Sequence, residues 1–374
     1  MSRSLLRFDW VMLCAIGVLL VMSCLFIYSA GFRNAEQALS GLAARQIVWS
    51  VIGLGCYSAA AAFDYRKLSS FHWWIYLAGI LALVLVLFFG MSVYGAHRWF
   101  RLGSITIQPS EFAKLATLFT LAAKLGDPSV DMDRFKTFLL AFLLAGIPFL
   151  LIAIEPDLGS AMVLVPIVLL LLFCAGMPLR PLLILIGIGV AGVLVLVVWL
   201  LFFPDSCAFL TEYQKNRILV YLNVNQDPLG AGWNKLQSQI AVGSGGLFGK
   251  GYLKGTQNIL GFLPRTVAPT DFIYSVVAEE SGFAGSSVLL FLYTTVIVRC
   301  MSAAVQARDM FGRLLASGIG VLFFTHVFVN IAMTIGLMPI TGVPLPLMSY
   351  GGTFMVSTMT ALGLVQSVYL RRRI

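Results

Sequence analysis

Long apolar runs separated by short polar connections dominate this sequence. Each run approaches or exceeds the roughly 20 residues that a helix needs to cross a bilayer. Backbone polar groups in lipid must be satisfied within their own segment, so we expect every run to be helical. The pattern predicts an all-α polytopic membrane protein with one domain, 1–374, and about ten transmembrane helices. The predicted spans are 10–30, 45–63, 73–91, 110–126, 138–154, 158–175, 180–203, 271–298, 312–335 and 350–370.

One polar stretch, 204–270, is too long to be a simple connection between the seventh and eighth spans. Basic residues and a glycine cluster occur along it, but segments 218–222, 236–242 and 258–263 are too apolar for a disordered linker. We therefore expect a large extracytoplasmic loop that contains short amphipathic or re-entrant segments.

Composition and charge narrow the class of protein. With 59 % hydrophobic and 11 % charged residues, the chain is not a soluble domain. The apolar core of the first span exceeds that of a cleavable signal peptide, so we expect it to be retained. The net charge of +9 suggests nucleic acid, but topology explains much of it. With both termini cytoplasmic, more than half of the 25 basic residues lie in cytoplasmic segments, as the positive-inside rule requires.

The basic residues left on the outer side call for a second explanation, such as an anionic ligand. Polar motifs also concentrate there, in segments 94–114, 155–159, 204–271 and 339–352. The last of these is rich in proline and glycine, which is tolerated at membrane depth only against protein or a wet cavity, so it predicts a cavity wall. We expect any chemistry to occur on the outer face.

Two familiar kinds of site are not indicated. The six cysteines show no C-x-x-C spacing and the three histidines are scattered, so neither a metal site nor a disulfide framework is predicted. Segment 243–251 resembles a phosphate loop but fails as one, because Ser244 replaces a required glycine and Gly251 replaces the Ser or Thr that binds magnesium. We interpret its glycines as permitting close approach of a ligand or another helix.

Asp271 is the leading candidate for chemistry. It opens the eighth span directly after Thr270, a natural N-cap, so an acidic first-turn residue favoured by the helix dipole is one interpretation. The same helix carries Glu279 and Glu280, roughly 12 Å further along. Carboxylates at that depth are costly and indicate function by default, so the three acids exceed what capping requires.

Arg98 and the Glu111–Lys114 pair each admit two interpretations. Arg98 flanks Trp99 and is either an interfacial anchor or a guanidinium fork for phosphate. Glu111 and Lys114 are three residues apart at the start of a span, so they share a helix face and can pair. A structural ion pair is the simpler interpretation, and the nearby Arg98 favours a functional one.

Taken together and in this order, the outer motifs resemble the SEDS family (shape, elongation, division and sporulation). The resemblance covers nearly the whole chain, and within the family it is closer to the elongation members than to the division members. The matching motifs are Tyr28-Ser29-Ala30, Arg98-Trp99, Gln108-Pro109-Ser110-Glu111, Glu155-Pro156-Asp157-Leu158-Gly159, Asp227-Pro228-Leu229-Gly230, Gln237-Ser238, 243–251, Gly255-Thr256-Gln257, Thr270-Asp271-Phe272-Ile273, Glu279-Glu280, Gly342-Val343-Pro344-Leu345-Pro346 and Ser349-Tyr350-Gly351-Gly352.

The resemblance implies a peptidoglycan glycosyltransferase that polymerises lipid II at the outer face of the cell inner membrane. It implies that Asp271 is catalytic, and it leaves room for a divalent cation, Mg²⁺ or Mn²⁺, on the pyrophosphate. It further implies a class B penicillin-binding protein as transpeptidase partner, together with the rod-shape proteins MreC and MreD. The residues that we expect to contact substrate are Arg98, Glu111, Lys114, Glu155, Arg217 and Glu279.

One departure from the family pattern precedes Asp271. Members commonly show Leu-Pro-Glu, one further residue and then His-Thr-Asp. Here Arg265 replaces the glutamate, Pro269 replaces the histidine, and two residues are added. The aspartate stays, so the reaction is unaffected, but the geometry of the loop before it is in question.

Two functions of other classes remain as alternatives. A lipid II flippase or other transporter would suit acids within spans, but it needs polar groups at the bilayer midplane and access from both sides. A non-catalytic membrane scaffold of the elongation machinery would tolerate substitution of Asp271 and lose partner binding instead. The concentration of polar motifs on the outer side favours the enzyme.

Overall fold

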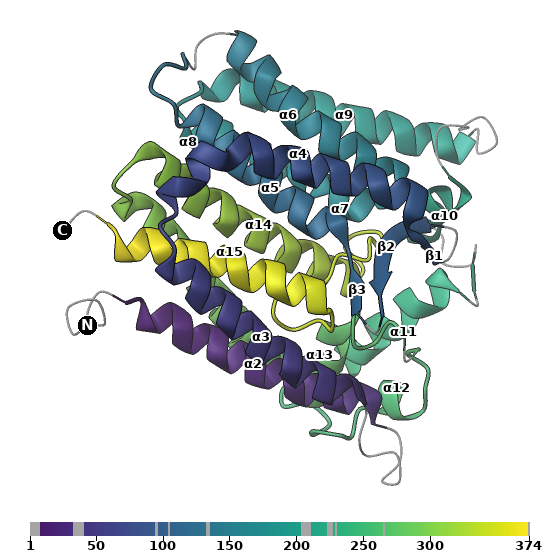
Figure 1. The fold of residues 1–374 in the computed structure, drawn as a ribbon. Coiled ribbons are helices and arrows are strands. Elements are labelled where there is room, and N and C mark those ends of the chain that lie inside the picture. The colour runs from purple at the N-terminus through teal and green to yellow at the C-terminus, as the bar shows by residue number, and fades with distance from the viewer. Residues whose placement is uncertain are drawn as a thin grey trace.

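The protein is a bundle of long helices with a small sheet and several short helices at one end (Figure 1). The computed structural model describes residues 8–32, 41–93, 96–103, 105–131, 135–202, 211–222, 227–228, 230–264 and 266–372. The elements are α2 (Trp10–Gly31), α3 (Gly41–Ala62), α4 (Arg66–Phe89), β1 (Met91–Val93), β2 (Ala96–Leu102), β3 (Ile105–Ile107), α5 (Pro109–Leu125), α6 (Phe135–Ile154), α7 (Leu158–Met162), α8 (Leu164–Cys174), α9 (Leu179–Phe202), α10 (Glu212–Leu222), α11 (Ala231–Ser244), α12 (Thr256–Ile259), α13 (Ile273–Gln306), α14 (Met310–Thr334) and α15 (Gly352–Leu370).

Each predicted span coincides with helix in the structure. Among the described residues, seven helices are long and apolar enough to cross a membrane: α2, α4, α6, α9, α13, α14 and α15. Segment Leu158–Cys174 is apolar but shorter, and it is divided at Val163 into α7 and α8. The chain is therefore a multi-pass membrane protein.

The all-α prediction is wrong in one place, because residues 91–107 form an antiparallel sheet in the order β1-β2-β3. Gly103 lies in the turn between β2 and β3 with φ of +63°, the left-handed backbone that tight hairpin turns require. Strands of three residues carry too little alternation to be seen in the sequence. The sheet delivers Arg98 and leads directly into α5.

The two ends of the bundle differ. Figure 1 shows the beginning of α2 and the end of α15 at one end, with the sheet, α7 and α10–α12 at the other. The predicted loop 204–270 thus contains short helices, as expected, within its described residues. Cys207 and Arg265 lie outside the described residues.

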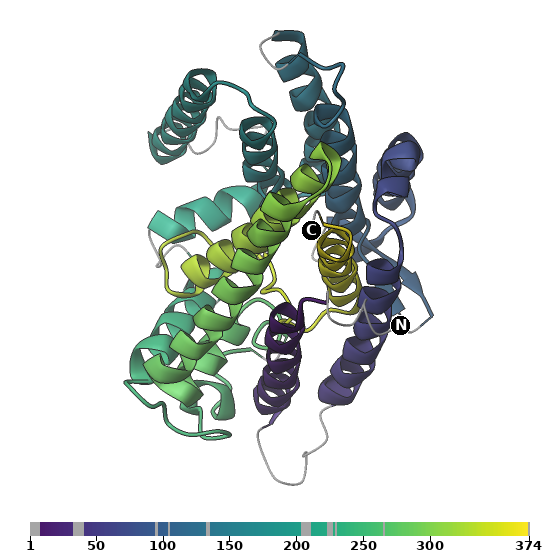
Figure 2. The same cartoon turned by 90° about the vertical axis from the view of Figure 1, so that its left-hand side faces the viewer.

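Burial separates central from peripheral helices. In its most apolar window α15 is 72 % buried, whereas α9 is 6 % buried, so α9 presents its side chains to lipid. The turned view places α15, in yellow, inside the bundle (Figure 2). It packs tightly on α3, since a Cβ added at Gly363 would lie 2.4 Å from the carbonyl oxygen of Tyr57. Small residues allow such close approach of helices in membranes.

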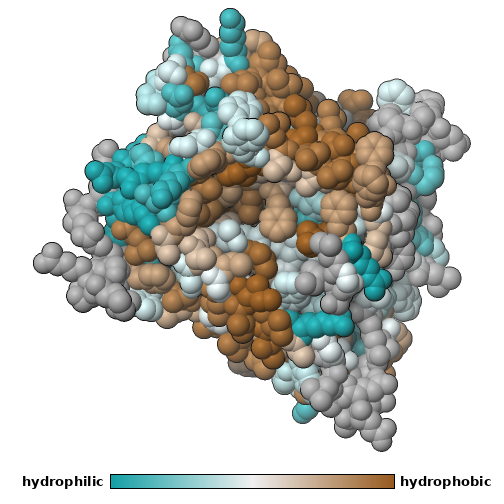
Figure 3. Space-filling view, in the orientation of Figure 1, coloured by the Kyte–Doolittle hydropathy of each residue, from teal (hydrophilic) through white to brown (hydrophobic). Residues whose placement is uncertain are grey.

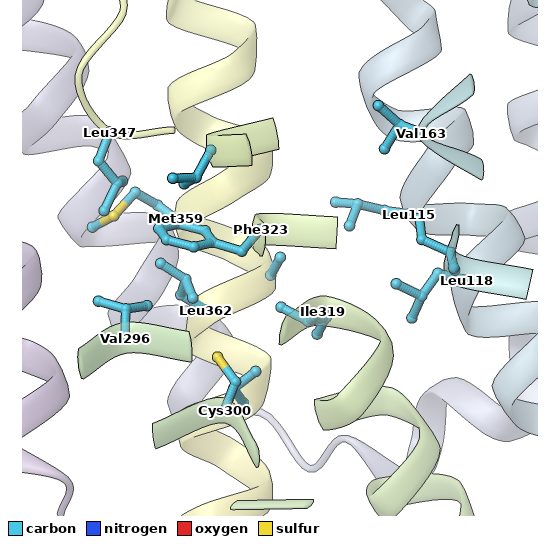
Figure 4. Close-up of a cluster of buried hydrophobic side chains, with 14 of the residues drawn as sticks. Leu115, Leu118, Val163, Val296, Cys300, Ile319, Phe323, Leu347, Met359 and Leu362 are labelled. Atoms are coloured by element: carbon cyan, nitrogen blue, oxygen red, sulfur yellow. The ribbon is translucent and has the colours of Figure 1, made fainter. Parts of the chain in front are cut away.

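The core and the outer surface are both apolar. Leu118 of α5, Cys300 of α13, Phe323 of α14 and Met359 of α15 belong to one buried cluster that joins the central helices (Figure 4). On the exterior, apolar surface covers the middle of the molecule and hydrophilic residues gather toward its ends (Figure 3). This banding is that of a protein surrounded by lipid at mid-height.

Candidate active site

Asp271 lies in a turn two residues before α13 begins, and its side chain is half-buried. The prediction that Thr270 caps this helix is wrong. Phe272 occupies the N-cap position without a side-chain bond, and the Thr270 hydroxyl donates backward to the carbonyls of Thr266 and Val267, each at 3.3 Å. The carbonyl of Val267 accepts the N–H of Asp271 at 3.0 Å, so the turn folds on itself and leaves the Asp271 carboxyl group out of capping.

Arg217 of α10 is the basic residue that most affects Asp271. Burial raises the pKa of the Asp271 carboxyl group, and the positive charge of Arg217 opposes that rise. The Arg217 guanidinium donates from Nη1 to the carbonyl of Thr341 at 2.7 Å, so the segment after α14 holds it in place.

Gly342 lies next to both the Arg217 guanidinium and the Asp271 carboxyl group. Its φ is +74°, and a Cβ placed there would lie 3.5 Å from both Arg217 Nη2 and Asp271 Oδ2. A side chain at this position would therefore stand against both functional groups as well as strain the backbone. Segment 339–352, predicted to be a cavity wall, lies next to Asp271 at Gly342, and its part in a cavity stays a prediction.

Arg98 reaches the turn between α6 and α7. Its Nε donates to the carbonyl of Glu155 at 2.8 Å, and its Nη2 donates to the carbonyl of Pro156. Arg98 also lowers the pKa of Asp271 electrostatically, whereas Asp157 raises it. The β2 strand, the turn between α6 and α7, and the turn before α13 therefore lie close enough for their charges to interact.

Glu155 is a buried acid with an unusual environment. Its side chain is 1 % exposed, and neither carboxyl oxygen has a hydrogen-bond partner among the residues that the structure describes. Burial raises its pKa to about 8, with a further upward contribution from Asp157 and a downward one from Arg98. Glu155 therefore carries a proton at neutral pH.

The predicted pairing of Glu111 with Lys114 is confirmed. Lys114 Nζ lies 2.9 Å from Glu111 Oε1, and their side chains are 1 % and 4 % exposed respectively. Lys114 also contacts His326 Nε2 at 3.1 Å, and His326 Nδ1 lies 3.3 Å from the carbonyl of Pro344. His326 is not among the predicted site residues, although a polar residue within an apolar span indicates a buried polar partner such as Lys114.

The Glu279 carboxylate is bonded to residues of the loop before α13 and does not cap α13. Its Oε1 accepts from Lys250 Nζ at 2.7 Å, from the Thr256 hydroxyl at 2.9 Å and from the N–H of Gln257 at 3.0 Å. The neighbouring Glu280 accepts from Ser29 of α2. A substrate contact for Glu279 stays a prediction, and the structure gives it three partners within the protein.

The glycine-rich segment fills a break in α13. The helix is interrupted at Gly282, where φ is +66° and ψ is −160°. Four backbone groups freed by this break pair with the segment: the carbonyls of residues 279 and 280 accept from residues 250 and 251, and the N–H groups of residues 283 and 284 donate to residues 246 and 247. A Cβ at Gly249 would lie 2.1 Å from the Glu280 carbonyl oxygen. The predicted close approach of another helix is confirmed.

The described residues include no group of three His, Cys, Asp or Glu side chains arranged to hold a metal ion.

Two relatives of known activity match the chain over almost its whole length. The chain is 38 % identical to the peptidoglycan glycosyltransferase MrdB of Escherichia coli strain K12, covering 98 % of this chain and 94 % of the relative. It is 33 % identical to the peptidoglycan glycosyltransferase RodA of Treponema pallidum over 99 % of both chains.

Solved structures also match the fold of this chain over almost its whole length. The rod shape determining protein RodA of Thermus thermophilus matches with a TM-score of 0.71 at 29 % identity, over 98 % of this chain and 97 % of that one. A chain from a study of polymerization and crosslinking by a peptidoglycan synthase complex matches with a TM-score of 0.79 at 31 % identity, over 98 % of both. The family model FtsW/RodA/SpoVE, described as cell cycle protein, matches residues 3–374, and the chain belongs to this family.

Proposed function

We propose that this protein is a RodA-type peptidoglycan glycosyltransferase that polymerises lipid II into β-1,4 glycan strands, with Asp271 as the catalytic residue. The observation that carries the proposal is the half-buried Asp271 carboxyl group, whose pKa is raised by burial and which lies close to Arg217 beside Gly342. Relatives named peptidoglycan glycosyltransferase match it over almost the whole chain, which supports this activity.

The chemistry requires a base and an anion-binding group. Asp271 removes the proton from the acceptor sugar hydroxyl as that oxygen attacks the anomeric carbon of the donor. The bond from that carbon to the lipid pyrophosphate breaks, and direct displacement inverts the α-linked donor to a β-linkage. Charge develops on the departing pyrophosphate, which Arg217 and Arg98 stabilise. A divalent cation, Mg²⁺ or Mn²⁺, accompanies the pyrophosphate in this proposal.

The remaining predicted substrate contacts have different parts in the proposal. Glu155, neutral at pH 7, acts as a hydrogen-bond donor toward a sugar or peptide group of the substrate. Glu111 and Lys114 act through His326, which contacts Lys114 and lies 3.3 Å from the carbonyl of Pro344. Glu279 acts through the segment that contains Lys250 and Thr256.

We place the protein in the cell inner membrane with ten spans, both termini in the cytoplasm and residues 204–270 on the outer side. Strand β2, which carries Arg98, and helix α10, which carries Arg217, lie at the end of the bundle opposite to the beginning of α2 and the end of α15 (Figure 1), and this supports the orientation. The partner is a class B penicillin-binding protein, in an elongation machinery with MreC and MreD. The match to a chain of a peptidoglycan synthase complex supports such a partner.

The decisive experiment compares wild type with Asp271→Asn and Asp271→Ala in polymerisation of purified lipid II, with and without the transpeptidase partner. We expect both variants to fold, as judged by thermal unfolding in detergent, and to lose at least 10³-fold in rate, since the base is removed. Normal polymer from folded Asp271→Asn would exclude this role. In that case lipid II transport across vesicles and partner co-purification would test the flippase and scaffold alternatives.

A further inference from the structure

The backbone that carries Asp271 is fixed at three consecutive carbonyl groups. Each carbonyl accepts one hydrogen bond, and each donor comes from a part of the chain more than 50 residues away. The three bonds run from the N–H of Tyr350 to Pro269 at 2.8 Å, from the hydroxyl of Ser349 to Thr270 at 2.5 Å, and from the side-chain amide of Asn330 to Asp271 at 2.9 Å.

Asn330 joins two segments that border the candidate site. Its Nδ2 donates to the carbonyl of Asp271 and also to the carbonyl of Val343 at 2.8 Å, next to Gly342. The side chain is fully buried in α14, where a polar group is costly unless it is paired. One amide thus sets the spacing between the Asp271 turn and the segment that borders its carboxyl group.

Ser349 acts as a second bridge. Its hydroxyl accepts the N–H of Leu345 at 2.8 Å and donates to the carbonyl of Thr270, and the residue is 1 % exposed. A hydroxyl that accepts from one segment and donates to another couples their positions. Both Asn330 and Ser349 therefore tie the same wall to the same three-residue turn.

We infer that Asn330 and Ser349 are positioning residues that hold the Asp271 turn at a fixed distance from the segment bearing Gly342. With the backbone fixed at residues 269–271, only side-chain torsions remain to place the carboxyl group. Loss of either donor leaves a part-buried carbonyl without this partner, and the turn relaxes toward another one. A displacement of about 1 Å at a reacting group costs roughly 10²-fold in rate.

The inference rests on the proposed role of Asp271, and its test separates the two. Asn330→Leu keeps the branched shape of the side chain in a larger volume and removes both donated bonds, whereas Ser349→Ala removes the hydroxyl from a different carbonyl. Ser317→Ala is the matched control, because Ser317 is also buried in α14 but its partners, the carbonyl of Leu314 and the side chain of Cys174, do not belong to the Asp271 turn. Rates of lipid II polymerisation are measured against substrate concentration and normalised to folded protein.

We expect kcat to fall about 10- to 100-fold in Asn330→Leu and Ser349→Ala, with KM within about threefold of wild type and Ser317→Ala unchanged. A kcat within threefold of the control in either folded variant overturns the inference, as does a rise in KM with kcat unchanged. If one variant does not fold, the other decides, since each acts on a separate carbonyl. An active Asp271→Asn would refute the proposed function itself, whereas an inactive Asp271→Asn beside normal positioning variants would refute only this inference.

Discussion

Asp271 and the Glu111–Lys114 pair both place charge inside a membrane protein, but their surroundings differ. Lys114 and Glu111 are almost fully buried and bonded to each other, and Lys114 has His326 as a further partner. Asp271 is only half-buried. Arg217, the basic residue that lowers its pKa most, donates a hydrogen bond to the carbonyl of Thr341.

The difference distinguishes two uses of buried charge. The geometry of the buried pair is fixed by the bond between its two members and by the contact of Lys114 with His326. The Asp271 carboxyl group is instead half-buried beside an arginine, with a pKa raised by burial, which is typical of functional sites. The two charged groups therefore differ in how deeply they are buried and in how neighbouring residues hold them.

The largest expected effect comes from breaking the paired cluster. Lys114→Ala leaves Glu111 buried without its cation, which we expect to cost about 3–5 kcal/mol of stability. Replacing both partners by apolar groups, as Glu111→Leu with Lys114→Met, removes the uncompensated charge and restores most of that stability. Thermal unfolding in detergent measures both.

Polymerisation by the double variant then decides between the two interpretations of this pair. A structural pair predicts activity close to wild type per folded molecule. If the double variant is stable but inactive, Lys114 or Glu111 contacts substrate, and the distinction between paired and open clusters fails here.

Features determined by local sequence could be predicted. The long membrane helices follow from the apolar runs, since lipid leaves the backbone no other way to satisfy its polar groups. The Glu111–Lys114 pair follows from i, i+3 spacing, and the close approach at 243–251 follows from its glycines. Asp271 was identified from its carboxylate at the entry to a span and from the family resemblance.

Features determined by contacts distant in sequence were missed. Thr270 satisfies the rules for an N-cap, but the turn before α13 occupies its hydroxyl with carbonyls instead. The break at Gly282 is stable only because a segment from the preceding loop fills it. His326 and Asn330 are four residues apart on one face of α14, but nothing local indicates that both bond the segment at 343–344.

Arg217→Gln gives an intermediate effect and tests the open cluster. Because the Arg217 charge lowers the pKa of Asp271, its removal raises that pKa further. The base must be ionised, so we expect the acid limb of the kcat/KM profile to move to higher pH. We also expect roughly a tenfold loss of rate at pH 7 from weaker pyrophosphate binding.

Arg217→Lys is the matched control for charge. It keeps the cation but not the planar fork, so the acid limb should stay near that of wild type while KM rises. An acid limb that does not move in Arg217→Gln would show that Arg217 does not tune Asp271, and Arg217 would then act on substrate alone.

The smallest expected effect on activity is that of Glu155→Gln. Its pKa of about 8 means that Glu155 is largely neutral at pH 7, so an amide of the same shape should preserve polymerisation within about threefold. Stability should respond instead. Between the ordinary pKa near 4.5 and about 8, the unfolded carboxyl group is ionised while the folded one keeps its proton, so the wild type loses stability as pH rises through that window.

Glu155→Gln lacks this titration, so its melting temperature relative to wild type should increase from pH 5 to pH 8, by about 2–5 °C. Thermal unfolding of both proteins across that range measures the difference, with Asp64→Asn as a control at a partly exposed acid whose pKa is lowered by Arg66 rather than raised by burial. An equal pH dependence in wild type and Glu155→Gln would mean that Glu155 is ionised in the folded protein. Glu155 would then belong with the paired charges, and a cation from the substrate or from solution would have to be its partner.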